Sequence, residues 1–256
     1  MLLRFLGTGT STGVPQLRCD CPVCRSTDPR DRRMRCSAMV ETGGKKLLID
    51  CGPDFREQML RFYPQGDIDA LLVTHHHYDH VGGCDDLRPY CKGKEAFDVY
   101  CNADVAADMH RRMPYCFAEH PYPGVPRYDI HEVKAGDIFD VHGVEVEAMQ
   151  VNHYLLEILA YRIGPLGYIT DAKHIPDETI RRMRGVDTLV INALRQKEHI
   201  SHMTLAESLE AIARIAPRRA YLTHLSHDMG FTADLDARLP EGVTAAQDGM
   251  TVEIDD

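Results

Sequence analysis

Short apolar runs alternate along the chain with segments in which apolar residues recur at helical spacing. The apolar runs are rich in Val, Ile and Leu and are bounded by Gly, Asp or Pro, which predicts strands. These strands are expected at residues 2–6, 38–42, 46–50, 70–74, 97–101, 144–151, 158–163, 167–170, 188–192, 220–223 and 251–254. Helices are expected at residues 54–62, 103–112, 177–183, 204–215 and 233–238. Many strands interleaved with helices predict an α/β (α+β) fold, in which sheet packs against sheet with helices outside.

The composition is that of an ordinary globular protein. The chain has 256 residues, of which 44% are hydrophobic and 27% are charged. Neither a long linker nor a low-complexity segment divides it. We therefore expect one domain over residues 1–256, with a cysteine-rich loop at about 16–36.

Charge and cysteine content narrow the partners and the compartment. The formal net charge of −10 argues against a nucleic-acid partner, because proteins that bind the phosphate backbone usually carry a basic face. No apolar run approaches the ~18 residues of a membrane span, and the apolar run at the start is too short for a signal peptide. An odd number of cysteines, nine, favours a reducing compartment. We expect a cytoplasmic protein without membrane attachment.

The strongest chemical signal follows the fourth predicted strand. Residues 75–80 read His-His-His-Tyr-Asp-His, in which His75, His77, Asp79 and His80 form the pattern His-x-His-x-Asp-His. Imidazoles bind borderline ions such as zinc, and a carboxylate adds negative charge and can accept a proton. One tight loop can then hold two ions about 3.5–4 Å apart, with the first two histidines on one ion and the last two residues on the other. The alternative is a solvated polar loop, but four such residues after a buried strand are rare by chance.

This pattern matches the signature of the metallo-β-lactamase superfamily, and the chain resembles that family. The resemblance implies a four-layer αββα sandwich with the metals at one edge of the two sheets. It also implies three further metal ligands, each directly after a predicted strand, namely His153, Asp171 as the bridge between both ions, and His224. Asp50 matches a family position that orients the metal loop without binding metal.

A second metal signal lies in the cysteine-rich loop. Cys19, Cys21 and Cys24 form the pattern Cys-x-Cys-x-x-Cys, and three thiolates so close together suit a structural zinc. Such a zinc normally takes four ligands, and His227, three residues after His224, is the candidate for the fourth. Three unmetallated thiols and a redox pair are the alternatives.

Three features narrow the resemblance to one subgroup. The glycine-rich segment at residues 7–15, the Cys-x-Cys-x-x-Cys loop and the late His-Leu-Ser-His at 224–227 resemble the phosphoribosyl cyclic phosphate phosphodiesterases, or PhnP-type proteins. The resemblance runs from Phe5 to about Met250. It implies a phosphodiesterase that acts on small cyclic phosphodiesters, of the ribose cyclic phosphate or cyclic nucleotide type. It further implies two divalent ions in the active site, zinc or manganese, one structural zinc, and a homodimer.

A mechanism follows from these residues. We expect a metal-bridging hydroxide to attack phosphorus, because two cations lower the pKa of bound water, and Asp79 to orient this nucleophile. A leaving alkoxide needs a proton, and His202 matches the position of a catalytic histidine in the subgroup. His199 is the nearby competitor. Arg88 either contacts a phosphate oxygen or forms an ion pair with Asp85 or its neighbour.

Other functions of the same fold stay open at this point. A tRNA 3′-processing-type endonuclease uses a similar metal loop, but the net charge and the lack of an obvious basic, Gly/Pro-rich arm argue against it. A thioester hydrolase of the glyoxalase II type needs a C-terminal helical domain, for which the tail after His227 is too short, and a lactone hydrolase is a related option. A non-catalytic metal-binding module is disfavoured because every expected ligand position is retained. We expect residues 90–127 to form part of the pocket wall, and we assign no substrate contact to them.

Overall fold

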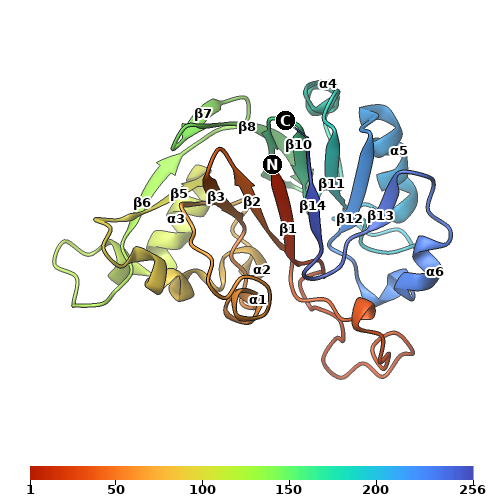
Figure 1. Ribbon diagram of the computed structural model, residues 1–256, viewed down its shortest axis with the longest axis horizontal. Helices are drawn as coiled ribbons and strands as arrows, with labels where there is room; N and C mark the ends of the chain where they lie inside the picture. The colour runs from red at the N-terminus through yellow and green to blue at the C-terminus, as the bar shows by residue number, and fades with distance from the viewer. Residues whose placement is uncertain (256) are drawn as a thin grey trace.

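The computed structural model describes residues 1–255, and two seven-stranded sheets pack face to face in it with helices on both outer faces (Figure 1). In spatial order, the first sheet contains β14 (Thr251–Glu253), β1 (Leu2–Gly7), β2 (Ser37–Thr42), β3 (Lys45–Ile49), β4 (Ala70–Leu72), β5 (Phe97–Cys101) and β6 (Tyr128–Glu132). The second contains β13 (Val243–Ala245), β12 (Arg219–Thr223), β11 (Thr188–Asn192), β10 (Leu166–Ile169), β9 (Leu156–Ile163), β8 (Val144–His153) and β7 (Ile138–Val141). The αββα sandwich predicted from the sequence is confirmed.

The helices form the two outer layers. They are α1 (Phe55–Phe62), α2 (Tyr78–Val81), α3 (Ala103–Arg112), α4 (Asp177–Met183), α5 (Leu205–Ile215) and α6 (Thr232–Asp236), with short 3₁₀ helices η1 (Pro29–Asp31), η2 (Cys84–Cys91), η3 (Pro114–Phe117) and η4 (His227–Met229). Helix α5 begins at a capping box, in which the Thr204 hydroxyl accepts a hydrogen bond from the Glu207 amide while the Glu207 carboxylate accepts one from the Thr204 amide. No helix among residues 1–255 has the length and apolar character needed to cross a membrane.

Three hydrophobic cores hold the four layers together. The central core fills the space between the sheets and contains fully buried side chains such as Leu47 and Tyr161. A second core, around Phe55 and Met109, lies between the first sheet and helices α1 and α3. The third, around Ile212, lies between the second sheet and the helices of the C-terminal half. Because each sheet is covered on both faces, its central strands are apolar throughout, as the continuous Val/Ile/Leu runs of the sequence indicate.

Parallel pairing gathers the ends of the central strands at one edge of each sheet. Strands β3, β4, β5 and β6 run parallel to one another in the first sheet. Strands β10, β11, β12 and β13 do so in the second. Loops that follow parallel strands emerge together, so residues distant in sequence come together beyond the carboxyl ends of these strands.

Most predicted elements are present, and the differences concern short or edge elements. Strands β6, β7 and β13 were not expected, because β6 contains charged residues, β7 has only four residues and β13 only three. Strand β4 ends at Leu72, two residues before its expected end, and helix α6 begins at Thr232 and ends at Asp236 rather than covering 233–238. Short edge strands give weak patterns, since only part of their surface is buried.

The cysteine-rich loop extends from the sandwich below β1 and β14 in Figure 1 and is anchored at its base by a buried arginine. The Arg33 guanidinium donates hydrogen bonds to the Thr8 hydroxyl at 2.8 Å, to the Thr232 hydroxyl at 2.9 Å and to the Ala246 carbonyl at 2.5 Å. These bonds tie the loop to the C-terminal part of the chain. They hold Cys19–Cys24 next to the segment that contains His227.

Candidate metal centre

The predicted metal ligands lie at the ends of strands from both sheets. The His-x-His-x-Asp-His loop follows β4, and His153 is the last residue of β8. Asp171 and His224 follow β10 and β12, and both adopt a left-handed backbone, with φ of 57° and 56°. This conformation is uncommon for residues other than glycine. It turns the chain sharply at the end of each strand, where the two sheets meet.

The structure brings these residues together in two adjacent groups. The first group contains His75, His77 and His153, whose ligand atoms lie within 4.8 Å of one another. Its imidazole rings are 4.6 to 5.6 Å apart, measured between centroids. His77 and His153 contact each other although they come from different sheets. Three imidazoles that converge in this way form a suitable set for one borderline divalent ion.

The second group contains Asp79, His80, Asp171 and His224, again with ligand atoms within 4.8 Å. His80 Nε2 lies 3.2 Å from Asp171 Oδ2 and 3.3 Å from Asp79 Oδ2. His224 Nε2 lies 3.0 Å from Asp171 Oδ1. Since the His75 ring is 4.2 Å from the His80 ring, the two groups share a wall. The residues predicted from the sequence to hold the second ion therefore lie together in the structure.

Unsatisfied nitrogens show that the residues fit metal ions. The Nε2 atoms of His75, His80 and His224 are buried and have no hydrogen-bond partner among the described residues. Buried polar atoms are normally paired, because leaving one unpaired costs roughly 1–3 kcal/mol. These nitrogens face a common space that also receives carboxylate oxygens. A cation in each group would satisfy all of them.

The electrostatics of the second group also favour a cation. Burial alone would lower the pKa of His224, but the Asp171 and Asp79 carboxylates raise it to about 10. Burial alone would raise the pKa of Asp171, but the neighbouring His224 and His80 hold it well below its usual range. In the first group, burial lowers the pKa of His75 well below its usual value, which keeps the imidazole neutral and one ring nitrogen free to bind an ion. Without metal, protons on the second group supply the positive charge that its carboxylates need.

Outer residues hold the ligands in position. Asp50 is fully buried, adopts a left-handed backbone with φ of 61°, and accepts a hydrogen bond from His80 Nδ1 at 2.7 Å. Its Oδ1 also accepts a hydrogen bond from the Thr74 amide at 2.8 Å. His153 Nδ1 donates to the Ser201 carbonyl at 2.8 Å. Such partners fix the imidazole tautomer, so that Nε2 faces the metal position.

The sequence analysis did not identify a pair that occurs three times, in which a threonine directly precedes a predicted metal ligand. Thr74, Thr170 and Thr223 each precede a predicted ligand at a strand end, and all three are fully buried. The Thr170 hydroxyl donates to Asp171 Oδ2 at 2.6 Å, and the Thr74 hydroxyl lies 3.0 Å from His75 Nδ1. The dipeptides Thr-His, Thr-Asp and Thr-His at the ends of predicted strands could have revealed these threonines in the sequence.

His202 lies at the wall of the two groups. Its Nδ1 is 3.7 Å from Asp171 Oδ1, and its ring lies 4.5 Å from His153 and 4.8 Å from His224. Burial, and then the positive charge of His224, lower the pKa of His202 to about 3. This environment favours the neutral imidazole. His199 lies farther out, 5.1 Å from His202 between ring centroids.

Arg88 forms an ion pair with Asp85, which is one of the two interactions that the sequence analysis considered for it. Its guanidinium lies 2.9 Å from Asp85 Oδ2 and donates to the Gly124 carbonyl at 2.7 Å. The Tyr115 hydroxyl donates to the same carboxylate at 2.9 Å. These contacts attach residues 114–124 to the segment that follows the metal loop. They give Arg88 a structural role in this conformation.

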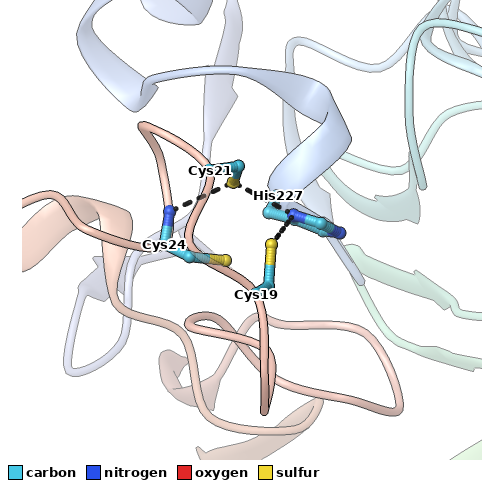
Figure 2. A group of neighbouring side chains, drawn as sticks. All are labelled: Cys19, Cys21, Cys24 and His227. Atoms are coloured by element: carbon cyan, nitrogen blue, oxygen red, sulfur yellow. Dashed lines mark hydrogen bonds between the residues drawn. The ribbon is translucent and has the colours of Figure 1, made fainter.

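The three cysteines and His227 converge in a separate cluster (Figure 2). His227 Nδ1 lies 3.2 Å from Cys21 Sγ and 3.4 Å from Cys19 Sγ, and the Cys24 amide donates to Cys21 Sγ. Burial alone would raise the pKa of Cys21, but the bonds from the Cys24 amide and His227 lower it to about 6. The pKa of Cys24 is raised to about 11, first of all by burial. A thiolate within a Cys₃His set has the composition of a structural zinc site.

An αββα sandwich with a His-x-His-x-Asp-His loop at the junction of its sheets defines a hydrolase of the metallo-β-lactamase fold. A family model described as "Beta-lactamase superfamily domain" matches residues 45–225, so the chain belongs to this family.

Individual relatives agree with this assignment. A crystal structure of a new diphosphatase from the PhnP family superposes with a TM-score of 0.91, at 38% identity, over 99% of this chain and 98% of that one. An octanoyltransferase of Porphyromonas gingivalis is 42% identical over 98% of this chain and 51% of its own length. A ribonuclease Z of Haloarcula marismortui is 30% identical over 67% of this chain and 48% of its own length. The chain spans about half the length of these two curated relatives, so their names do not say which part carries their activity. The resemblance to PhnP-type proteins is confirmed.

Proposed function

We propose that this protein is a dinuclear metal-dependent phosphodiesterase that hydrolyses small cyclic phosphodiesters, of the ribose cyclic phosphate or cyclic nucleotide type. The observation that carries the proposal is the pair of adjacent ligand groups with the neutral His202 at their common wall. Likeness to a diphosphatase of the PhnP family supports cleavage of a phosphorus–oxygen bond. Paired divalent ions are typical of enzymes that carry out this displacement.

The residues that would hold the ions are divided between the two groups. His75, His77 and His153 would hold one ion, and Asp79, His80 and His224 the other. Asp171 would serve both, because its carboxylate oxygens lie within 4.8 Å of ligand atoms of His80 and His224 in the second group and of His153 in the first. Zinc or manganese suits this mixture of nitrogen and oxygen donors. When bound, two such ions lower the pKa of water and neutralise charge on phosphoryl oxygens.

The remaining steps fall to the side chains. Asp79, a buried member of the second group, would orient the attacking water through the carboxylate oxygen that does not face His80. His202 would hold the proton for the leaving oxygen. A bound phosphate would raise the pKa of His202, because its negative charge opposes the effect of burial and of His224. Proton transfer would then be coupled to the presence of substrate.

The second candidate reaction is hydrolysis of a diphosphate linkage in a small molecule. It is favoured by the similarity to a diphosphatase of the PhnP family, whose structure matches this chain nearly end to end. Both reactions displace an oxygen from phosphorus, and both use the same ligand groups. They differ in whether the leaving group is an alkoxide, which needs a proton, or a phosphate, which does not. Loss of His202 should therefore harm diester hydrolysis more than diphosphate hydrolysis.

Three further proposals concern the state of the protein. We propose that Cys19, Cys21, Cys24 and His227 hold a structural zinc, since they converge as a Cys₃His set. None of the nine cysteines, all of which lie within residues 1–255, forms a disulfide bond, which supports a reducing, cytoplasmic location. We also propose a homodimer, as the family resemblance implies.

A substrate panel tests the proposed function. Wild type and His202→Ala would be assayed with bis(p-nitrophenyl) phosphate, 2′,3′-cyclic nucleotides, a ribose cyclic phosphate and a nucleoside diphosphate ester. We expect wild type to prefer the cyclic phosphodiesters. Preference for the diphosphate would establish the second candidate. Hydrolysis of thioesters or lactones, with every phosphate substrate left intact, would overturn both.

A further inference from the structure

The edge strands β6 and β7 lie at the same end of the sandwich (Figure 1), and a polar cluster of Asp98, Asp129, His131 and His142 links this edge of the two sheets. We propose that this cluster is a further divalent-cation site, suited to zinc, which ties the edge of one sheet to the edge of the other. It shares no residue with the dinuclear centre or with the cysteine cluster.

The register of β5 and β6 brings three of the four groups together. Asp98 pairs with Asp129 and Tyr100 pairs with His131 along the parallel ladder. Residues two apart on a strand share a face, so the side chains of these two pairs lie on the same face of the first sheet. Tyr100 on that face belongs to the core between the sheets. Ligand atoms of Asp98, Asp129 and His131 lie within 4.8 Å of one another.

The fourth group comes from the second sheet. His142 and Gly143 form the two-residue turn between β7 and β8, with φ of 56° and 94°. Turns with two left-handed residues usually contain Asn-Gly or Asp-Gly. Here a histidine occupies the first position, and its Nε2 lies 3.1 Å from Asp98 Oδ2. The Nε2 atom of His131 lies 2.7 Å from the other oxygen of the same carboxylate. Asp98 thus receives one imidazole from each sheet.

An aromatic stack orients the His131 imidazole. Its ring lies 4.5 Å from the Tyr100 ring at an interplanar angle of 19°. Phe139, on β7, stacks on Tyr100 at 5.3 Å and the same angle. The stack therefore crosses from the first sheet to the second beside the cluster. A side chain held in this way loses little conformational freedom when it binds an ion.

The charge of the cluster favours a cation. Among residues 1–255, the ion-pair partners of Asp98 and Asp129 within 4.0 Å are the two histidines alone. The pKa of Tyr100 is raised, first by burial and then by the charges of Asp98, Asp140 and Asp129, which indicates a negative potential here. Each imidazole nitrogen needs either a proton or a metal ion between itself and a carboxylate. Zinc accepts this set of imidazoles and carboxylates, whereas magnesium and calcium prefer oxygen ligands alone.

The test compares zinc binding by wild type and His142→Asn. Asparagine is favoured in this turn, so the substitution removes the imidazole and keeps the backbone. His120→Asn, at an exposed histidine outside the cluster, is the matched control. Each protein, purified with its metals, would be titrated with Zn²⁺ at pH 7.5 and its bound zinc counted. Thermal midpoints would be recorded with and without added zinc, and phosphodiesterase activity would show that the catalytic site is intact.

We expect wild type and His120→Asn to bind one more zinc ion per chain than His142→Asn. Zinc should raise the thermal midpoint of wild type and His120→Asn more than that of His142→Asn. The activity of all three proteins should be equal. Equal zinc binding by wild type and His142→Asn would overturn the proposal. A midpoint that responds to acid but not to zinc would also overturn it, because the cluster would then be a proton-dependent ion pair. Neither result depends on which substrate the enzyme hydrolyses.

Discussion

Replacing Asp50 by asparagine should weaken metal binding without removing a metal ligand. The Asp50 carboxylate accepts from Thr74 through one oxygen and from His80 Nδ1 through the other. An asparagine that keeps its oxygen toward Thr74 turns its NH₂ group toward His80. Nδ1 must then accept, and the imidazole proton moves to Nε2, which can no longer bind an ion. The flipped amide instead sets its NH₂ group against the Thr74 amide, which leaves two buried donors opposed.

The expected loss follows from the role of such partners. Removing a hydrogen-bond partner of a ligating histidine typically lowers metal affinity about 10- to 100-fold, which corresponds to roughly 1.4–2.7 kcal/mol. The full burial of Asp50 and His80 places the expected loss near the upper end, because water cannot replace the bond. Activity at limiting metal should fall in proportion, and excess metal should restore part of it.

A competition assay with a chromophoric chelator measures this loss. Wild type, Asp50→Asn and the control Asp69→Asn would be titrated with zinc under the same conditions. Asp69 accepts a bond from the Lys46 amide, away from the metal ligands, so its replacement should leave affinity unchanged. If Asp50→Asn binds both labile ions as tightly as wild type does, the orienting role assigned to Asp50 is wrong.

Three other predictions concern His202 as the proposed proton donor, the cysteine cluster and pH. His202→Ala should lower the turnover of cyclic phosphodiesters by roughly 10²- to 10⁴-fold with metals retained, whereas His199→Ala should not; steady-state kinetics with metal analysis decides. Cys24→Ser should lose one zinc ion and have a lower thermal midpoint, whereas Cys91→Ser, outside the cluster, should keep the zinc. An unchanged zinc content in Cys24→Ser would refute the Cys₃His site. Metal uptake at pH 7.5 should release protons, because His224, with a pKa of about 10 in the metal-free site, is protonated there and must lose its proton to bind. Apparent affinity should therefore rise with pH up to about 10; calorimetry in buffers of different ionisation enthalpy measures the release, and its absence would contradict the assignment.

The candidate site could be predicted from the sequence because its proposed ligands follow apolar strands. The His-x-His-x-Asp-His loop begins soon after β4, Asp171 lies two residues after β10, and His224 comes directly after β12, so the periodicity that reveals the strands also locates these residues. A resemblance to a known family supplied the order in which the later ligands appear. The structure adds the distances that divide them into two groups.

Other features depend on tertiary contacts that a single sequence does not display. The pKa of His202 depends on burial and on His224, which follows β12 and is distant in sequence, and neither is visible in local sequence. The link between His131 and His142 also joins residues of different sheets through Asp98. Strands β6 and β7, which carry this link, were missed because edge strands bury too little surface to show a clear alternation.

The most direct test of the account is to remove the metals stepwise and measure metal content and activity on the same sample. Protein dialysed against increasing chelator would be analysed for each element and assayed with bis(p-nitrophenyl) phosphate and a ribose cyclic phosphate. We predict that diester hydrolysis falls with the loss of two labile ions, returns when zinc or manganese is restored, and that one zinc resists mild chelation. A fully metallated protein that leaves every phosphodiester intact, or an activity that survives complete metal removal, would contradict the central claim.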